Sequence, residues 1–406
     1  MAREMKYSGV EWIGNIPASW KMSRLLWCLK EIKEKNNPIK TTNVLSLTNK
    51  LGVVPYEEKG NQGNKAKEDY SQYGLAFENT LVINSMNVLI GSVGISKYYG
   101  CVSPVYYVFK STENADLRYI NYIFQNTGFQ KELRKYANGI LEIRLRISSH
   151  DMLRRVIPLP SYDEQKHISD YLDTQCARID AVIEKTRASI EEYKKLKQAV
   201  ITQAVTKGIR PGREMKDSGV EWIGDAPNAW TILSLKYLCS MQAGKNLVSE
   251  QISESGEFPV YGGNGLRGYF IDYNCEGKYL LVGRQGALCG NVHRVEGQFW
   301  ATEHAVITKN SDLCDMDYLY YLLIGMNLNQ YVSSTAAQPG LAVSTIQNVR
   351  TCLPPLREQK EIASYLDNKI DEIQMLTEKK ESFLMELNTY KKSIIFEYVT
   401  GKKEVH

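Results

Sequence analysis

Two long stretches of the chain repeat one helical pattern of apolar positions. In the first, no Pro or Gly interrupts the sequence between Ser161 and Lys207, while Pro158 and Pro160 precede it and Gly208 follows it. Apolar residues recur every three or four positions, so the pattern predicts one helix of about 45 residues, roughly 65 Å long at 1.5 Å per residue. A helix of that length needs a partner along its apolar face.

The second stretch, Glu358–Thr400, repeats the first in register, with Glu-Gln-Lys and Tyr-Leu-Asp in both copies. A single apolar stripe would be typical of a buried core helix. Two matched copies favour a two-stranded coiled coil or a long antiparallel helix pair. The expected packing residues are Ile168, Leu172, Ile179, Val182, Ile190 and Val200 in the first copy and Ile362, Leu366, Ile373, Leu376, Leu384 and Ile394 in the second.

A shorter motif is repeated as well. Arg3–Trp20 and Arg213–Trp230 agree at about 13 of 18 positions, which marks an internal repeat. Each half of the chain is therefore a shared head, a long insert and a shared helix, and the two inserts can hardly be aligned with each other. We expect a first globule in residues 1–157, a spacer helix in 158–207, a second globule in 208–353 and a second helix in 354–406.

Both inserts alternate between strand-like and helix-like segments, which is typical of an α+β fold. Helices are expected at Leu117–Phe124, Phe129–Tyr136 and Asp317–Gly325, and a short one at Met22–Lys35. The predicted architecture is two mixed α/β globules separated by a pair of long antiparallel helices, with a pseudo-twofold internal repeat.

The two inserts differ in net charge. The chain of 406 residues carries a net charge of +4, which by itself does not indicate a polyanionic partner. Residues 21–157 hold 20 Lys and Arg against 12 Asp and Glu, about +8, whereas residues 231–352 hold 8 against 10, about −2. The first insert is therefore compatible with nucleic acid, and the second gains no support from charge.

The eight cysteines are scattered without a C-x-x-C pair, which favours free thiols in a reducing compartment over disulfides or zinc. The first residues are polar, and the longest apolar run, near residues 318–326, is far shorter than a membrane span. We therefore expect a cytoplasmic protein with no membrane partner.

Motifs that would indicate catalysis are weak. The glycine spacing in Gly263–Gly268 matches a dinucleotide-binding fingerprint, but a strand-like segment follows the third glycine where the fingerprint needs a helix, so a tight bend or a loop against a ligand is favoured. Glu276–Lys278 has the spacing of a nuclease carboxylate–lysine pair, but this triplet is frequent in proteins and does not by itself indicate a nuclease. His293 and His304, near Glu303, are more typical of ordinary histidines in a fold than of metal ligands. No metal site and no nucleophile–base pair are expected.

In its repeated motifs the chain resembles the specificity subunits of type I restriction–modification systems. The resemblance rests on the duplicated head SGVEWIG-x-x-P-x-x-W, the P-x-x-x-E-Q sequence that opens each long helix, and the Tyr-Leu-Asp within each helix. It covers essentially the whole chain. It implies that each insert is a target recognition domain that reads one half of an asymmetric, bipartite DNA site, while the helices act as a spacer.

The resemblance also implies partners and their cofactors. Besides double-stranded DNA, two methyltransferase subunits would dock on the helices, bind S-adenosylmethionine and methylate adenine. Two restriction subunits, which use ATP and Mg, would join them. The chain itself would be non-catalytic and would hold no cofactor.

Candidate DNA-reading residues are donors or amphipathic side chains beside glycine-rich turns or strand ends. An ordinary surface role is an equally good interpretation of each one. They are Lys97, Tyr98, Arg144 and Arg146 in the first insert and Asn264, Arg267, Arg284, Gln285 and Gln338 in the second.

Two other classes of function compete with DNA reading. A single-chain nuclease with two lobes would need a convincing carboxylate–lysine metal site, and cleavage of DNA by the purified chain with Mg²⁺ alone would favour it. A pure coiled-coil scaffold leaves two large, unlike inserts without a role, and failure of the assembled complex to bind DNA would favour it.

Overall fold

A computed structural model of the chain describes residues 3–48, 52–60, 69–139, 145–285, 289–332 and 340–405. The fold is α+β, and it divides into two compact units. Unit 1 is Met1–Thr186 with Ser382–His406, and unit 2 is Arg187–Glu381. Each unit has a main hydrophobic core of its own.

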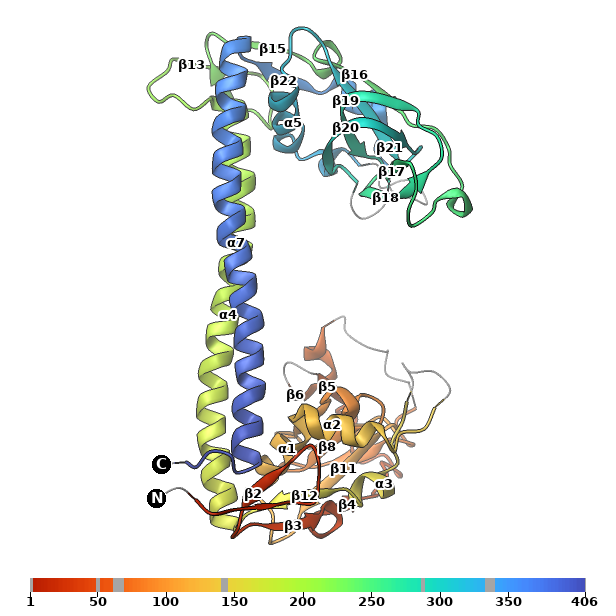
Figure 1. Ribbon diagram of the computed structural model, residues 1–406, viewed down its shortest axis with the longest axis vertical. Coiled ribbons are helices and arrows are strands. Elements are labelled where there is room, and N and C mark those ends of the chain that lie inside the picture. The colour runs from red at the N-terminus through yellow and green to blue at the C-terminus, as the bar shows by residue number, and fades with distance from the viewer. Residues whose placement is uncertain are drawn as a thin grey trace. The chain divides into compact units, whose positions relative to one another are not determined.

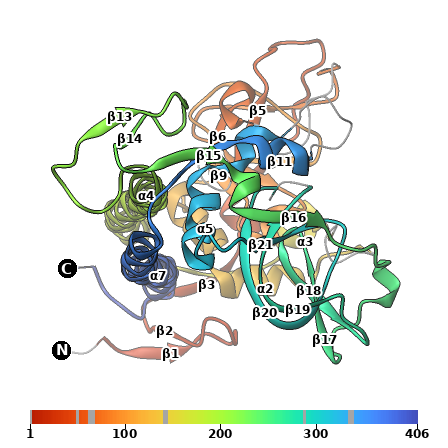
Figure 2. The ribbon, with the colours of Figure 1, turned by 90° about the horizontal axis from the view of Figure 1, so that it is seen from above.

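Two long helices contribute to both units (Figure 1). Helix α4 spans Tyr162–Lys207 and helix α7 spans Leu356–Val399, close to the predicted bounds. In unit 1 the beginning of α4 meets the end of α7, where the ring centroids of Tyr171 and Tyr398 are 4.4 Å apart. In unit 2 the end of α4 meets the beginning of α7 within one core. The helices are therefore an antiparallel pair, and Figure 2 shows their ends side by side.

Ten of the twelve predicted packing residues are buried or partly buried, but the prediction was wrong for Val182 and Leu376, which are 40% and 43% exposed. In α4 the buried position after Ile179 is Ile183, and at the matching position of α7 Thr377 is partly buried. A coiled-coil seam alternates steps of three and four residues. A side chain one residue off the seam is turned by about 100° and reaches solvent.

Unit 1 is built on a four-stranded antiparallel sheet in the order β4-β11-β8-β9. Helix α1 packs beside this sheet and is capped by the Asp116 side chain, which accepts bonds from the backbone N–H groups of Arg118 and Tyr119. The elements before α4 are β1 (Met5–Tyr7), β2 (Asn15–Pro17), β3 (Lys21–Arg24), β4 (Leu29–Ile32), β5 (Leu45–Thr48), β6 (Gly52–Pro55), β7 (Gly74–Ala76), β8 (Leu81–Asn84), β9 (Val93–Ile95), β10 (Gly100–Val102), β11 (Tyr106–Ser111), α1 (Leu117–Gln125), α2 (Thr127–Arg134), α3 (Ser149–Leu153) and β12 (Val156–Leu159).

Unit 2 contains the same four-stranded arrangement, extended by two strands, in the order β16-β21-β19-β20-β17-β18. The two inserts therefore share a core sheet that their sequences do not reveal. The elements between α4 and α7 are β13 (Met215–Asp217), β14 (Asp225–Pro227), β15 (Thr231–Ser234), β16 (Cys239–Ala243), β17 (Phe258–Gly262), β18 (Gly265–Phe270), β19 (Cys275–Gly283), β20 (Val292–Ala301), β21 (Ala305–Asn310), α5 (Met316–Gly325), α6 (Val343–Asn348) and β22 (Arg350–Leu353).

The helices expected at Leu117–Phe124, Phe129–Tyr136 and Asp317–Gly325 are confirmed as α1, α2 and α5. The helix expected at Met22–Lys35 is wrong. That segment forms β3, one short 3₁₀ turn and β4, because β3 pairs with β12 and β4 pairs with β11. Tertiary strand pairing outweighs local helix propensity there.

The repeated heads are fixed to the helices by the same bonds in both units. Trp20 Nε1 donates to Glu164 Oε2 at 2.9 Å, and Trp230 Nε1 donates to Glu358 Oε2 at 3.1 Å. An arginine of each head lies 2.5 Å from the second oxygen of the same carboxylate. The glutamate of each P-x-x-x-E-Q sequence is thus the point where the head meets the start of a long helix.

Each head is also bound by the end of the second long helix. Lys402, just beyond α7, donates from Nζ to the carbonyl oxygen of Ile13 at 2.8 Å. Lys207, at the end of α4, donates from Nζ to the carbonyl oxygen of Asp225 at 2.6 Å. Head 1 is therefore bound by the start of α4 and the end of α7, and head 2 by the start of α7 and the end of α4. This exchange of roles is the structural form of the internal repeat.

A short motif joins each insert to its helix. Tyr122 on α1 donates to Asp173 Oδ1 at 2.7 Å, and Tyr321 on α5 donates to Asp367 Oδ1 at 2.6 Å. Both tyrosines belong to an Asp-x-x-Tyr-x-x-Tyr sequence, and both aspartates belong to the repeated Tyr-Leu-Asp. The residues of the motif are Asp116, Tyr119 and Tyr122 in unit 1 and Asp315, Tyr318 and Tyr321 in unit 2.

All eight cysteines are buried free thiols, as expected from their spacing. Burial raises the pKa of Cys28 and Cys176 to about 11 and that of Cys239 and Cys352 to about 12. A thiol is reactive only as the thiolate. The folded chain should therefore react slowly with thiol reagents at neutral pH.

These thiols also make stability depend on alkaline pH. In the unfolded chain a thiol loses its proton near its ordinary pKa of about 8.5, whereas in the folded chain burial keeps it protonated. The folded state then binds more protons, so the free energy of unfolding should fall as pH rises from about 9 to about 11. Urea unfolding at pH 8 and pH 10.5 measures the loss. A C239A variant should lose less between the two pH values, and an equal loss would contradict the assignment.

Candidate nucleic-acid interface

The carboxyl end of one central strand, β8 in unit 1 and β19 in unit 2, is bonded in the same way in both units. In unit 1 the backbone N–H of Ile147 donates to the carbonyl oxygen of Ser85, just after β8, at 3.1 Å. In unit 2 the backbone N–H of Leu341 donates to the carbonyl oxygen of Arg284, just after β19, at 2.9 Å. The returning segment of each insert therefore joins the same strand end, and several predicted reading residues lie on these segments.

In unit 2 the structure brings most of the predicted residues together. Asn264 is exposed at the tip of the β17–β18 hairpin, between Gly263 and Gly265. A side-chain carbon added to Gly263 would lie 3.5 Å from the backbone nitrogen of Arg284 and 2.8 Å from the carbonyl oxygen of His304. The hairpin tip is therefore seated on the end of β19, and it can approach so closely because it carries glycine.

The other described candidates of unit 2 flank this place. Arg284 and Gln285 follow β19 and are half-buried, and Gln285 forms an isolated bridge with Gly340. Arg267 is exposed on β18 and lies over Gly262. Gln338 lies outside the described residues. The Gly263–Gly268 segment continues into β18 and not into a helix, which confirms that it is no dinucleotide fingerprint.

In unit 1 the predicted residues do not form one group. Exposed Lys97 and half-buried Tyr98 lie in the turn between β9 and β10, near the Leu81 end of β8. Arg146 is exposed and bridges to Asn138 near the opposite end of that strand. Arg144 lies outside the described residues. Tyr98 also packs on a small apolar cluster, so its ring has a structural role.

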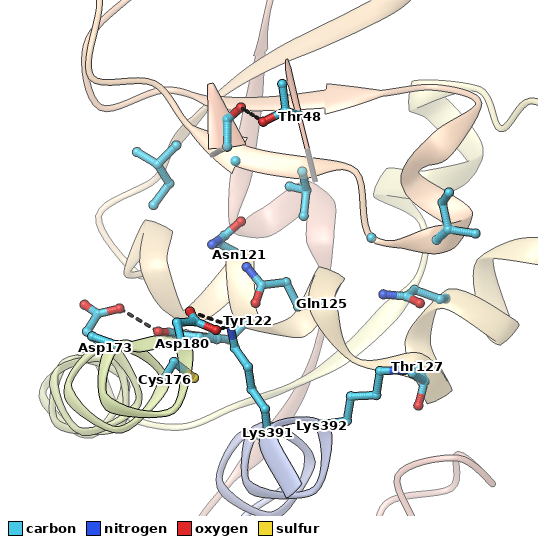
Figure 3. A pocket seen from close by; sticks show the side chains of 18 residues that line it. Thr48, Asn121, Tyr122, Gln125, Thr127, Asp173, Cys176, Asp180, Lys391 and Lys392 are labelled. Atoms are coloured by element: carbon cyan, nitrogen blue, oxygen red, sulfur yellow. Dashed lines mark hydrogen bonds and ion pairs between the residues drawn. The ribbon is translucent and has the colours of Figure 1, made fainter. Parts of the chain in front are cut away.

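Unit 1 has a groove of about 720 Å³ between α1, α4, α7 and the β9 region (Figure 3). Its lining is largely polar and includes Asn121, Gln125 and exposed Lys392. At the corresponding place in unit 2, Arg294 donates to Asp367 at 3.1 Å and its guanidinium lies 4.0 Å from the centroid of the Tyr320 ring. The two units therefore offer different surfaces on one scaffold.

Sequence reasoning missed a set of polar atoms beside the unit 2 hairpin. Glu303 Oε2, Thr302 Oγ1 and His293 Nε2 are buried and have no hydrogen-bond partner among the described residues. Glu303 Oε1 lies 3.1 Å from His304 Nε2. Desolvation lowers the pKa of His293, which keeps its ring neutral. The only sequence signal was the cluster of two histidines and a glutamate. The described residues contain no group of metal-ligating side chains that could hold an ion.

Two similar globules with unlike surfaces, fixed to one antiparallel helix pair, define a protein with two recognition modules on a repeated frame. The family model for the type I restriction modification DNA specificity domain matches residues 20–192 and again residues 227–383. The chain therefore belongs to the family of type I restriction–modification specificity subunits, with two DNA recognition domains. In the described part of the chain, each helix is too short or too polar to cross a membrane.

Curated relatives agree with this family. The chain is 44% identical over 138 residues to the type I restriction enzyme EcoprrI specificity subunit of Escherichia coli, a match that spans 33% of this chain and 34% of that protein. It is 23% identical to the MjaVIII specificity subunit of Methanocaldococcus jannaschii, over 96% of this chain and 94% of that one. Over about a third of its length this chain thus has a closely related sequence, and over nearly all of it a distant one.

Solved structures support the fold. A chain from a study of complex assembly and conformational transition of the type I R-M system superposes with a TM-score of 0.75 at 15% identity, covering 96% of this chain and 99% of that chain. The HsdS subunit of Thermoanaerobacter tengcongensis gives a TM-score of 0.51 at 15% identity, covering 96% and 98%. The shared fold therefore extends through both units and both helices.

Proposed function

We propose that each unit reads one half of a bipartite DNA site, and that the chain positions a methyltransferase on that site without catalysing a reaction itself. The observation that carries the proposal is one scaffold presented twice with two different surfaces. Identical surfaces would suit two identical half-sites, whereas these unlike surfaces favour an asymmetric target.

The helix pair would set the spacing of the half-sites. Helix α4 has 46 residues, which corresponds to roughly 69 Å of helix at 1.5 Å per residue. That length is comparable to about 20 base pairs, or two turns of a DNA duplex. A helix pair of this length suits two recognition domains that contact one duplex at separate places.

The helix pair would also dock two methyltransferase subunits. Helix α7 exposes large apolar side chains, among them Met375 at 57% and Met385 at 66%. Exposed apolar residues on an ordered helix favour a protein partner. Matched positions of the two helices also expose apolar side chains, Val182 with Leu376 and Leu196 with Tyr390, so two copies of the partner are expected. In this proposal S-adenosylmethionine belongs to the methyltransferase, and ATP and Mg belong to two restriction subunits.

Mapping of methylated adenines tests the proposal. The chain and its methyltransferase are expressed in a host that lacks both, and methylated adenines are located by sequencing the host DNA. We expect one asymmetric motif with two specified parts and an unspecified spacer. Omission of the chain should abolish the motif. Methylation without a motif would contradict the proposal, as would DNA cleavage by the purified chain with Mg²⁺ alone.

A further inference from the structure

Arg284 differs from the other half-buried arginines because its guanidinium has no partner among the described residues. Six arginines are half-buried in that part of the chain, and five of them have a partner: Arg3, Arg118, Arg155, Arg187 and Arg213. Arg284 is the sixth, and no described residue bonds its side chain. Charged groups that are withdrawn from water are normally paired, so a half-buried cation without an acceptor indicates a ligand that supplies one.

The guanidinium of Arg284 is also accessible to a ligand. In the described part of the chain, the buried side-chain nitrogens that lack a partner are Trp12 Nε1 and His293 Nε2. The nitrogens of Arg284 lack a partner too and are not among them, so they keep accessible surface. The side chain as a whole is half-buried, so its apolar stem is covered while the charged end faces solvent.

The backbone of Arg284 is held on both sides. Its N–H donates to the carbonyl oxygen of His304 at 2.9 Å, and its carbonyl oxygen accepts from the N–H of Leu341 at 2.9 Å. The thiol of Cys289 donates to the same carbonyl oxygen at 3.1 Å. A side chain that starts from such a fixed backbone loses less conformational freedom on binding, which favours a specific contact.

The same backbone position exists in unit 1 and carries a different side chain. Ser85 donates its N–H to the carbonyl oxygen of Val105 at 3.1 Å, and its carbonyl oxygen accepts from the N–H of Ile147 at 3.1 Å. One position of the shared scaffold thus holds a small, buried hydroxyl in unit 1 and a long, accessible cation in unit 2. This difference is what a residue that distinguishes two unlike half-sites should show.

The chemistry of the guanidinium selects among the parts of DNA. Guanine presents two acceptors, O6 and N7, at its major-groove edge, and the planar fork of an arginine matches both. Adenine and cytosine present an amino donor there, and thymine presents a single acceptor beside a methyl group. A phosphate would also accept from the fork, but the second insert, with 8 Lys and Arg against 10 Asp and Glu, is not a surface that favours phosphates.

We infer that Arg284 is a specificity-determining residue, and that its guanidinium donates two hydrogen bonds to O6 and N7 of a guanine in the half-site read by unit 2. The inference rests on the proposed DNA-reading function. The β17–β18 hairpin, whose tip is seated beside Arg284, is a two-stranded ribbon of the kind that a major groove admits. The exposed Asn264 at that tip places a second polar side chain on the same side of the strand end.

The experiment compares the methylated motif of the wild-type chain with that of R284Q, each co-expressed with the methyltransferase. The amide of glutamine matches adenine, so at one position of one half-site the preference should move from guanine toward adenine, with guanine disfavoured by about 10-fold. The other half-site should not change. R284M keeps the apolar stem and loses the donors, so it should relax the same position without a gain for adenine. Thermal melting reports whether each variant folds, and R284M decides the question if R284Q does not fold.

A matched control lies on the same strand. Lys278 is exposed on β19, 3.5 Å from Glu296, and K278Q removes one positive charge as R284Q does. K278Q should leave the motif unchanged. A motif that the Arg284 variants leave unchanged overturns the inference, as does a loss of methylation that is equal for every base, which is the result expected of a phosphate contact. Absence of any motif for the wild-type chain would instead overturn the proposed function.

Discussion

Replacing Gln165 with alanine is expected to destabilise unit 1 by about 3–5 kcal/mol, because it leaves several buried polar groups without partners. Gln165 is fully buried at the start of α4. Its Oε1 accepts from the backbone N–H of Asp116 at 2.9 Å, and its Nε2 donates to the carbonyl oxygens of Asn114 at 3.1 Å and Pro160 at 3.0 Å. The Gln165 side chain therefore connects the insert, the residue that follows β12 and the start of α4.

The repeat supplies a matched variant in unit 2. Gln359 makes the same three bonds, to the N–H of Asp315 at 2.7 Å and to two carbonyl oxygens at 3.0 and 2.9 Å. Q359A should cost unit 2 as much as Q165A costs unit 1. Urea unfolding gives the size of each loss, and hydrogen exchange locates it in one unit. Q130A removes one bond from a partly exposed side chain and should cost about 1 kcal/mol or less. A Q165A loss no larger than that of Q130A would contradict this account.

The repeated heads and the two long helices could be predicted from the sequence, because the signals that define them are local and occur twice. Helix bounds follow from proline, glycine and apolar period, and the doubled Glu-Gln sequence marks where each helix starts. Which apolar residues of each helix pack against the partner helix could not be predicted from the sequence alone. Val182 and Leu376 are apolar and matched between the copies, yet both are exposed. An apolar residue one step from a coiled-coil seam looks like a seam residue in the sequence, and only the partner helix decides.

The shared sheet of the inserts could not be predicted, because strand order is set by contacts between distant segments. The Asp-x-x-Tyr-x-x-Tyr sequence of Asp116–Tyr122 and Asp315–Tyr321 was a usable signal, since it places a capping aspartate and two tyrosines at the same point of each insert. The reading residues are harder still. The gathering of Asn264 and Arg284 depends on a hairpin seated on a strand end, a contact between segments that are distant in the sequence.

Replacing Gly401 with alanine should destabilise unit 1 by roughly 2–5 kcal/mol through two separable effects. Gly401 follows α7 with φ +68°, a left-handed conformation that costs alanine about 1–2 kcal/mol. An added Cβ would also lie 2.4 Å from Pro17 Cδ and 3.0 Å from the Trp20 ring, so the head would have to move off the helix end. Such overpacking typically costs about 1–3 kcal/mol more.

Matched glycines separate the two effects. Gly9 in head 1 has φ +76°, and an added Cβ there would meet nothing within 4 Å among the described residues, so G9A carries the backbone strain alone. Gly208, which follows α4 with φ +77°, would place a Cβ 3.2 Å from the Trp230 ring and 3.1 Å from the end of the flexible Arg213 side chain, a milder contact. Urea unfolding should therefore rank the losses G401A, G208A and G9A in descending order. Equal losses for G401A and G9A would show that the head does not rest on the end of α7, and the exchange of helix roles between the units would lose its main support.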